Sequence, residues 1–290
     1  MGKIKNNTTS RIISFYIKDV NQSKLKILKF ILQEFKNRIF KYFLSLKYSR
    51  STKKTIKIYN KVWKEKNNEK WFSKENNITV HRYGFKFFLS SNGLTQRIWQ
   101  QEMINKIHEI SPKNVLEVGS GNGINLKILS SNFNMINFKG IDYSIEGIKR
   151  SNELKKSLLK DNIFRPLNIN ANLNSKNLDF IYANARSLPF SDKNFDLIFT
   201  ILALEQMNNI VKEVLFEIKR CAARHIVLIE PFKELNNLGI KYLHHRANKY
   251  LDLDSNDFID ENYKLIEYKK KYPNKISLGV GLLHLERISK

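Results

Sequence analysis

VLEVGSGNG, residues 115–123, is the stretch that decides the fold of this chain. A short apolar strand runs directly into three closely spaced glycines, and a helical pattern follows from residue 124. Glycines permit positive φ and let a ligand approach the backbone closely. The first N–H groups of the following helix point toward the same place. The sequence therefore predicts a strand, a ligand-binding turn and a helix in succession.

The spacing of the glycines separates two common nucleotide-binding patterns from this one. A nicotinamide dinucleotide fingerprint has a glycine at the sixth position of G-x-G-x-x-G. Counted from Gly119, that position is Ile124, and the pattern here is G-x-G-x-G with Glu117 two positions before it. A P-loop ends in Gly-Lys-Ser/Thr, which this loop lacks.

Strands and helices alternate on both sides of the loop, which predicts a parallel sheet covered on both faces. The expected strands are 114–118, 138–142, 179–183, 195–200, 225–230, 264–270 and 282–288. The expected helices are 95–110, capped by Thr95, then 124–130, 145–160, 209–222 and one near 234–250. Residues 161–177 form an Asn-rich insertion.

Two polar residues follow the next strands along the chain. Asp142 ends the second strand, where a carboxylate can accept both hydroxyls of a ribose; a helix N-cap is the alternative. Asn184 ends the third strand and precedes Ala185. Its amide can hydrogen-bond an adenine edge, although an ordinary strand-end turn would also use it. Both residues favour a nucleoside ligand beside the glycine loop.

These three motifs, in this order and spacing, resemble the class I S-adenosylmethionine-dependent methyltransferases over residues 95–231. The resemblance implies a doubly wound, mostly parallel, Rossmann-like sheet of seven strands, whose last strand is antiparallel. The segments 264–270 and 282–288 would form its closing hairpin. The resemblance also implies S-adenosylmethionine as the cofactor, methyl transfer as the activity, and no metal.

The resemblance assigns cofactor binding to Glu117, Gly119, Ser120, Gly121, Asp142, Tyr143, Asn184 and Ala185. The glycines would lie beside the methionine part, with Glu117 supporting the loop, and Asp142 would bind the ribose. Tyr143 would lie beside the adenine, and Asn184 with Ala185 would hold the adenine edge. Position 184 is often Asp in similar sequences, so Asn keeps only part of that hydrogen bonding.

The catalytic residues stay unknown at this stage. Residues around Ile201 and Leu202 would flank the cofactor, and Gln206 stands where many similar sequences have His. A general base is needed for an alcohol acceptor, and a structural role is the alternative for every candidate. The candidate bases are His81, His108, Glu205, Glu230, His244 and His245.

One segment of the sequence narrows the chemical class of the methyl acceptor. Methyltransferases that act on a base amino group often carry Asn/Asp-Pro-Pro-aromatic after the fourth strand, where this chain has Thr200-Ile-Leu-Ala. The first hypothesis is therefore a small-molecule, lipid-linked or saccharide acceptor. The second is an RNA or protein methyltransferase that holds its polymer with a basic N-terminal arm. The third is a binding module without catalysis.

The N-terminal part differs from the rest in charge. The net charge is +24, and residues 1–70 hold 19 Lys/Arg against 4 Asp/Glu. Such an excess binds nucleic acid or anionic lipid, although a coding bias toward A and T would also enrich lysine. We therefore divide the chain into a basic, mostly helical extension and lid, residues 1–94, and a methyltransferase domain, residues 95–290.

Within the extension, residues 24–47 form a basic amphipathic pattern. Its apolar stripe contains Leu25, Leu28, Leu32, Phe35, Ile39, Phe43 and Leu46. The stripe could lie on anionic lipid or pack on the catalytic domain. Residues 1–23 are polar and expected to be loose, 48–75 form a linker or a further helix, and 76–94 are aromatic and loop-like.

The cysteine content and the hydropathy of the sequence indicate in which cellular compartment we expect the protein. The single cysteine, Cys221, falls in an apolar helical pattern and cannot build a disulfide framework. No signal peptide and no apolar stretch long enough to span a membrane stand out. We expect a cytoplasmic protein, with residues 24–47 as the candidate for contact with the inner membrane face and nucleic acid as a less favoured partner.

Overall fold

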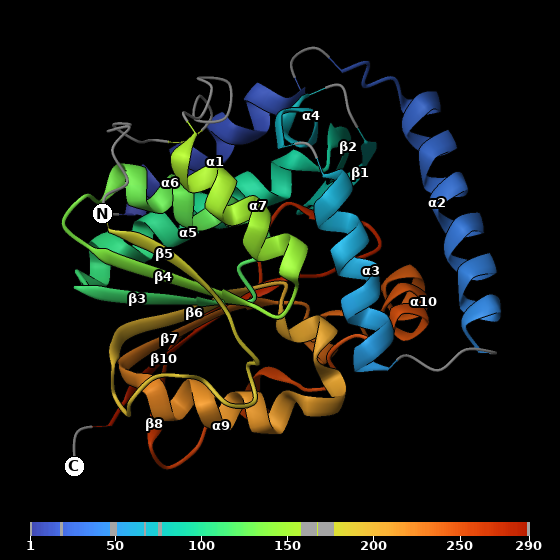
Figure 1. Ribbon diagram of the computed structural model, residues 1–290. Helices are drawn as coiled ribbons and strands as arrows, with labels where there is room; N and C mark the ends of the chain where they lie inside the picture. Colours follow the sequence, from blue (N-terminus) through green and yellow to red (C-terminus); the bar gives the residue numbers. More distant parts are fainter. Residues whose placement is uncertain are drawn as a thin grey trace.

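The computed structural model describes residues 2–17, 20–46, 51–66, 68–74, 77–157, 167 and 177–288. The Asn-rich insertion and the last residues of the helix expected over 145–160 lie largely outside these ranges. Figure 1 shows a central twisted sheet with helices on both of its faces and further helices beside one end.

The central sheet has seven strands in the order β5-β4-β3-β6-β7-β10-β8. The strands are β3 (Asn114–Val118), β4 (Asn137–Asp142), β5 (Leu178–Tyr182), β6 (Phe195–Ile201), β7 (Ala222–Glu230), β8 (Tyr263–Lys269) and β10 (Gly281–Arg287). Strands β3 to β7 pair in parallel, whereas β10 is antiparallel to both of its neighbours. The doubly wound sheet with an antiparallel last strand is confirmed.

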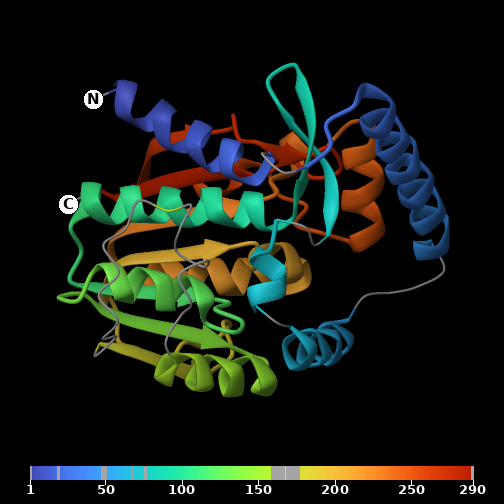
Figure 2. The same ribbon diagram turned by 90° about the horizontal axis from the view of Figure 1, so that it is seen from above.

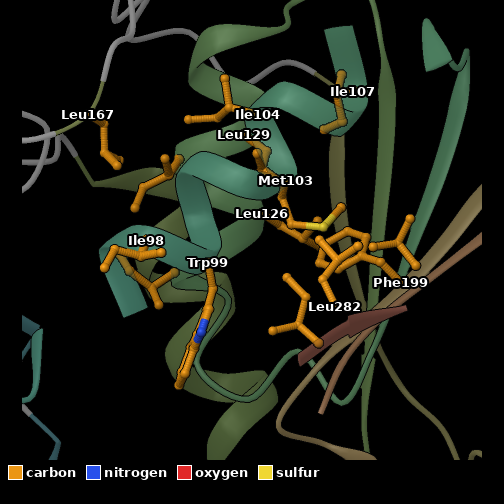
Figure 3. Close-up of a cluster of buried hydrophobic side chains, with 14 of the residues drawn as sticks. Ile98, Trp99, Met103, Ile104, Ile107, Leu126, Leu129, Leu167, Phe199 and Leu282 are labelled. Carbon is orange, nitrogen blue, oxygen red and sulfur yellow. The ribbon is translucent and has the colours of Figure 1, made fainter. Parts of the chain in front are cut away.

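Each face of the sheet is covered by its own layer of helices. The covering helices are α5 (Gly93–Ile110), α6 (Ile124–Asn132) and α7 (Ile145–Lys156) on one face and α9 (Val211–Cys221) on the other. Alternate residues of a strand point to opposite faces, so Val115 packs with α5 and α6 whereas Leu116 packs with α9. Figure 3 shows labelled side chains of α5 and α6 turned toward Phe199 and Leu282 of the sheet.

The N-terminal residues expected to be loose form a helix, α1 (Gly2–Ile17). Ile12 and Tyr16 are fully buried in the core that α5 shares with the sheet, and the Tyr16 hydroxyl donates to the carbonyl of Phe72 at 3.3 Å. The prediction failed because the apolar residues of this segment sit one helical turn apart among polar neighbours. Tertiary burial stabilises such a helix more than its own propensity does.

The segment expected to be a loop over 76–94 is a hairpin of β1 (Ile78–Tyr83) and β2 (Lys86–Ser91). Both runs are rich in β-branched and aromatic residues, and Gly84 takes the positive φ of +59° that the tight turn requires. A short strand, β9 (Asn274–Lys275), pairs with β1. The N-terminal part is thus joined to the C-terminal part, and the division at residue 94 stays a proposal.

Helix α2 (Lys24–Ser45) forms where the amphipathic pattern predicts it, but its stripe faces outward. The helix packs on α10 (Gly239–Asn248) and the hairpin through Ile27, Phe30 and Ile31. Figures 1 and 2 both show it at the edge of the molecule beside α10. The helix thus packs on the C-terminal part of the chain, which is one of the two expected alternatives, but it does so through residues beside the seven that define the stripe. No helix among the described residues has the length and apolarity needed to cross a membrane.

Two shorter helices complete the region expected to be a linker or helix. They are α3 (Thr52–Glu65) and α4 (Asn68–Phe72). Single 3₁₀ turns lie at Leu204–Gln206, Asn208–Ile210, Lys233–Leu235 and Ser255–Phe258. Thr95 does not cap α5 as expected. The helix begins two residues earlier, and the Thr95 hydroxyl donates to the carbonyl of Asn92 at 3.2 Å.

Candidate functional site

The glycine loop lies between β3 and α6, and its backbone excludes side chains. Gly119 and Gly121 have φ values of +80° and +55°, a region that L side chains rarely adopt. A Cβ on Gly119 would lie 2.5 Å from the Cβ of Ala203, and one on Gly121 would lie 2.4 Å from the Trp63 ring. Both positions thus require glycine for conformation and for space.

Glu117 ties the loop to the helix that follows it. The side chain is 1% exposed, and its Oε1 accepts a hydrogen bond from Asn125 Nδ2 of α6 at 2.8 Å. Asn125 in turn accepts from Gln100 of α5 at 2.9 Å. Burial raises the pKa of Glu117 to about 8, against the opposing hydrogen bond from Asn125. Glu117 is therefore a supporting group below the loop, and it does not line the cavity described below.

Asp142 fixes the loop from the neighbouring strand. Its Oδ2 accepts the N–H of Gly121 and its Oδ1 accepts the N–H of Ser144, both at 2.8 Å. Burial raises the pKa of this carboxyl, and the backbone donors oppose the shift. The Tyr143 ring stacks on that of Tyr182, with centroids 5.2 Å apart. The helix cap above Asp142 is Ser144, not Asp142, because the Ser144 hydroxyl accepts the N–H of Gly147.

Asn184 uses its side chain locally. Its Oδ1 accepts the N–H of Arg186 at 3.1 Å, as in an Asx turn. The amide nitrogen is then the group that remains to donate to a ligand. The two roles expected for Asn184 therefore involve different atoms. Its Oδ1 forms the strand-end turn, and its amide nitrogen can donate to a ligand.

A cavity of about 1180 Å³ opens at the carboxyl ends of the central strands. Six of the eight predicted cofactor residues line it, together with Ile201 and Leu202. The six are Gly119, Ser120, Asp142, Tyr143, Asn184 and Ala185. Gly121 does not line it because Trp63 lies against it. The cavity thus joins the ends of β3, β4, β5 and β6 at the place where the strand order reverses, between β3 and β6.

The opposite wall comes from helices of the N-terminal extension, which the sequence described as a lid without assigning individual residues to the site. Tyr59 and Trp63 of α3, Lys66, and Trp71 of α4 line the cavity. The Lys66 Nζ lies 4.7 Å from the Trp63 ring centroid and 4.6 Å from that of Trp71. Burial lowers the pKa of this ammonium group to about 8. The signal was present, because tryptophans are uncommon in a Lys- and Asn-rich linker.

Helix α3 is held over the loop by hydrogen bonds to α7. The Asn60 Oδ1 accepts from the Ser144 hydroxyl at 2.6 Å and from the N–H of Glu146 at 3.4 Å. The Arg150 guanidinium donates to the carbonyl of Lys64 at 2.9 Å. The helix that covers Gly121 is thus anchored to the segment that follows Asp142.

Of the six candidate bases, Glu205 lines the cavity and the other five do not. Glu230 is fully buried and accepts the N–H groups of residues 203, 204 and 205, and burial raises its pKa to about 7. It therefore shapes the turn that carries Glu205. His81 lies buried in the hairpin, stacked on Phe88. The remaining three are His108, which packs on Phe133, and His244 and His245 of α10.

Within the described residues, no group of three or more His, Cys, Asp or Glu side chains could hold a metal ion. Cys221 is buried and unpaired, and burial raises the pKa of its thiol. It lies in the core around α9 and not at the cavity.

Comparison with known proteins agrees with this geometry. Residues 116–228 match the family described as "Methyltransferase domain". With its glycine loop and its sheet order, this part of the chain has the features of the class I S-adenosylmethionine-dependent methyltransferases.

A stretch of 145 residues is 32% identical to the ubiquinone/menaquinone biosynthesis C-methyltransferase UbiE of Rickettsia prowazekii (strain Madrid E). It covers 48% of this chain and 53% of that protein, so the chain spans about half the length of this relative. Among solved structures, a SAM-dependent methyltransferase of Methanosarcina mazei is 18% identical with a TM-score of 0.49, covering 64% of this chain and 98% of its own. The PH0226 protein of Pyrococcus horikoshii OT3 is 16% identical with a TM-score of 0.48, covering 68% and 92%.

The residues at the cavity fit S-adenosylmethionine, the cofactor of this class. The Ser120 hydroxyl lines the cavity, is buried, and has no hydrogen-bond partner among the described residues. A buried polar atom without a partner is costly, and a ligand that bonds it removes this cost. Gly119 lies beside Ser120 and also lines the cavity.

Proposed function

We propose that this protein transfers the methyl group of S-adenosylmethionine to a small-molecule acceptor. The observation that carries the proposal is one cavity with two different walls. Predicted cofactor residues form one wall, and α3, α4 and the turn after β6 form the other. Ligand pockets usually measure roughly 300–1,000 Å³, and this one, at about 1180 Å³, offers room for a second molecule beside the cofactor.

In this proposal the cofactor is held by the residues at the three strand ends. The loop backbone and the Ser120 hydroxyl bind its methionine part, and Asp142 binds the ribose. Tyr143, Asn184 and Ala185 surround the adenine. Bound S-adenosylmethionine supplies a methyl group on a positively charged sulfur. The protein contributes position, and a proton leaving the acceptor passes to Glu205.

The lining of the acceptor wall favours a lipid-linked molecule over a saccharide. It consists largely of aromatic and aliphatic side chains, including Tyr59, Trp71, Met207, Leu278 and Val280. The relative from Rickettsia prowazekii is named for ubiquinone and menaquinone biosynthesis, which also supports a small molecule. The alternative hypothesis is an RNA or protein acceptor. The third hypothesis is a module that binds the cofactor without catalysis.

The test is methyl transfer from labelled S-adenosylmethionine into a lysate of the source organism, later divided into lipid, small-molecule, saccharide, RNA and protein fractions. We expect label in the lipid or small-molecule fraction with the wild type and none with Asp142→Ala. Loss of two hydrogen bonds to a carboxylate should weaken cofactor binding by about 10-fold or more. Asp142→Asn, which keeps one acceptor oxygen, should lose less.

Label in the RNA or protein fraction would replace the acceptor class proposed here. Cofactor binding without label in any fraction would support the inert binding module. A thermal melt of each Asp142 variant checks that the loop-tethering hydrogen bonds are not needed for folding, so that lost binding is read as a site effect.

We propose further that α2 contacts an anionic membrane surface. All seven residues of its apolar stripe are exposed, from 40% for Phe35 to 80% for Leu25. Lys29 and Lys36 border the shallow groove that Leu25, Leu28 and Leu32 form on this face. An amphipathic helix of this kind lies in the lipid interface, and each lysine near an anionic surface contributes about 1 kcal/mol.

Co-sedimentation with vesicles tests this contact. The protein should sediment with vesicles that contain phosphatidylserine and less with pure phosphatidylcholine, and salt should weaken binding. Leu25→Ser combined with Leu32→Ser and Phe43→Ser should abolish it without lowering stability, because these side chains are exposed. Phe216→Ser with Leu238→Ser, exposed at 69% and 78% elsewhere, is the matched control. Unchanged sedimentation of the triple variant would reject the contact.

A further inference from the structure

The cavity has an excess of positive charge that the cofactor does not explain. Among the described residues that line it, seven are Lys or Arg and three are Asp or Glu. S-adenosylmethionine itself carries a sulfonium, an ammonium and a single carboxylate, so its net charge is positive. Like charges in a partly buried cavity repel one another. The surplus among the described residues favours an anionic group on the other occupant of the cavity.

Part of this charge converges where α2, α10 and β9 meet. Lys41 of α2 and Lys275 of β9 line the cavity, and Lys41 Nζ donates to Asn248 Oδ1 of α10 at 2.8 Å. Arg38, one turn before Lys41, donates to Glu34 at 2.6 and 2.9 Å. Three cationic side chains thus come from two elements that are distant in the sequence.

A second set of contacts holds these elements together. The Ser277 hydroxyl, two residues after Lys275, donates to Glu34 Oε1 at 2.7 Å, which fixes the β9 segment against α2. Beside them, His244 of α10 is 9% exposed, and its Nδ1 lies 2.9 Å from Asn248 Nδ2. The site therefore combines an exposed lysine, Lys41, that bonds Asn248 with a second lysine, Lys275, on a segment that Ser277 holds against α2.

The electrostatics show that these groups affect one another. Burial lowers the pKa of Lys275 to about 8, and Arg38 adds to this effect, while Glu34 and Glu205 oppose it. Burial also lowers the pKa of His244, and the charges of Arg38, Lys41 and Lys275 act in the same direction. Glu34 is already engaged by Arg38 and Ser277. An anion beside Lys41 and Lys275 would relieve the repulsion among the cations.

We propose that Lys41 and Lys275 bind an anionic group, a carboxylate or a phosphate, on the acceptor. The apolar body of the acceptor lies along the aromatic wall of α3 and α4. The acceptor is then an anionic amphiphile, which rests on the proposed function and narrows its substrate class. Arg38 does not line the cavity, and it bonds Glu34, which also accepts from Ser277. Charge-assisted hydrogen bonds of this kind are roughly twice as strong as neutral ones.

The tryptophans provide a direct readout. All three tryptophans of the chain, Trp63, Trp71 and Trp99, line the cavity, so their emission reports entry of a ligand there and not binding on the outer face of α2. Hexyl phosphate and hexyl glucoside, which share one apolar chain and differ in charge, serve as probes below their micelle concentrations. The wild type should bind hexyl phosphate at least about 10-fold more tightly.

Lys41→Met with Lys275→Met should remove this preference and leave the weaker binding of hexyl glucoside unchanged. Lys54→Met, which removes a cavity lysine on α3, is the control and should keep the preference. Lys41→Met alone, at an exposed side chain, should reduce it even if the double variant folds poorly. The proposal is overturned if the wild type binds both probes equally or binds neither of them. It is also overturned if the double variant keeps the preference for hexyl phosphate.

S-adenosylmethionine binding, measured on the same proteins by calorimetry, separates this failure from that of the proposed function. If the wild type binds the cofactor but shows no preference for hexyl phosphate, the anion subsite alone is overturned. Absent cofactor binding in the wild type overturns the proposed function, whatever the two probes do.

Discussion

Glu117 is a carboxylic acid that is enclosed by the protein on every side, with one oxygen bonded to Asn125 and the other without a partner among the described residues. Its pKa of about 8 means that it is largely protonated at neutral pH. A glutamine has the same shape and the same lack of charge. The residue thus acts as a neutral hydrogen-bonding group in the support of the glycine loop.

This leads to the first prediction. Glu117→Gln should change the free energy of unfolding by less than about 1 kcal/mol, whereas Glu117→Ala should lower it by about 2–3 kcal/mol, because it opens a buried cavity and removes the acceptor of Asn125 Nδ2. Urea denaturation at about pH 4.5, where the Glu117 carboxyl is largely protonated in the folded chain and close to half protonated in the unfolded chain, measures both. The prediction is wrong if the two variants are equally destabilised.

The pH dependence of the same residue gives a second measurement. The folded pKa lies above the unfolded value of 4.5, so the stabilising contribution is complete below that value and is lost as the pH rises through about 8. Relative to Glu117→Gln, the wild type should therefore lose stability over this range. Parallel curves for the two proteins would mean that Glu117 ionises as readily in the folded chain.

Sequence reasoning found the residues whose roles depend on local order. The glycine loop and Asp142 follow their strands directly, so their meeting at one sheet edge was predictable from alternation. Lys66 and Lys275 reach the same cavity from segments far apart in the chain. The surroundings of these two lysines depend on how α3 and β9 pack against the rest of the molecule. No pattern in the sequence predicts that packing. The assignment of roles to individual residues stays a prediction.

At the scale of elements, the attachment of α3 governs how the glycine loop is covered. Asn60 supplies one side-chain oxygen to two donors of the α7 N-terminus. Asn60→Ala removes both hydrogen bonds, each worth about 1 kcal/mol. Backbone amides of α3 should then exchange hydrogen about 10-fold faster, with those of the central sheet unchanged.

The control for this prediction is Lys57→Ala, on the exposed side of the same helix. It should leave the exchange of α3 as in the wild type. Faster exchange in the control, or unaltered exchange in the Asn60 variant, would show that the hydrogen bonds to α7 do not hold the helix.

The elements of the sheet were predictable because buried parallel strands and their helices have strong periodicity. The hairpin β1–β2 was missed because its second strand, KFFLSS, carries aromatic and apolar residues on consecutive positions without a clear alternation. Helix α1 was missed because its polar residues outnumber the two that are fully buried. In both cases contacts with distant segments determine the structure. Contacts with α10 and the hairpin likewise determine which side of α2 faces outward.

At the scale of the whole molecule, we expect buried histidines to lower the stability of the fold in acid. His81 is fully buried, and both ring nitrogens lack a partner among the described residues. Burial lowers its pKa to about 3, and burial also lowers the pKa of His284 to about 4. Such groups stabilise the fold above their unfolded value of 6.5, and this contribution is lost as the pH falls toward the folded value.

His81→Phe tests this at one site. Between about pH 7.5 and about pH 5, the wild type should lose about 2 kcal/mol more unfolding free energy than the variant. His108→Phe, at an exposed position, is the control and should lose as much unfolding free energy over this pH range as the wild type does. Urea denaturation at the two pH values gives the comparison, and equal losses in His81→Phe and the wild type would contradict it.

The order of the strands constrains the order in which the sheet can be completed during synthesis. Strand β8 precedes β10 in the chain but pairs in the sheet with β10 and not with β7. Until β10 has been made, the β7 edge is open and β8 has no sheet edge to join. An open edge invites pairing with another chain. A ribosome that pauses between residues 270 and 280 would therefore present a nascent chain whose cavity-forming strands exist but whose sheet is still able to aggregate.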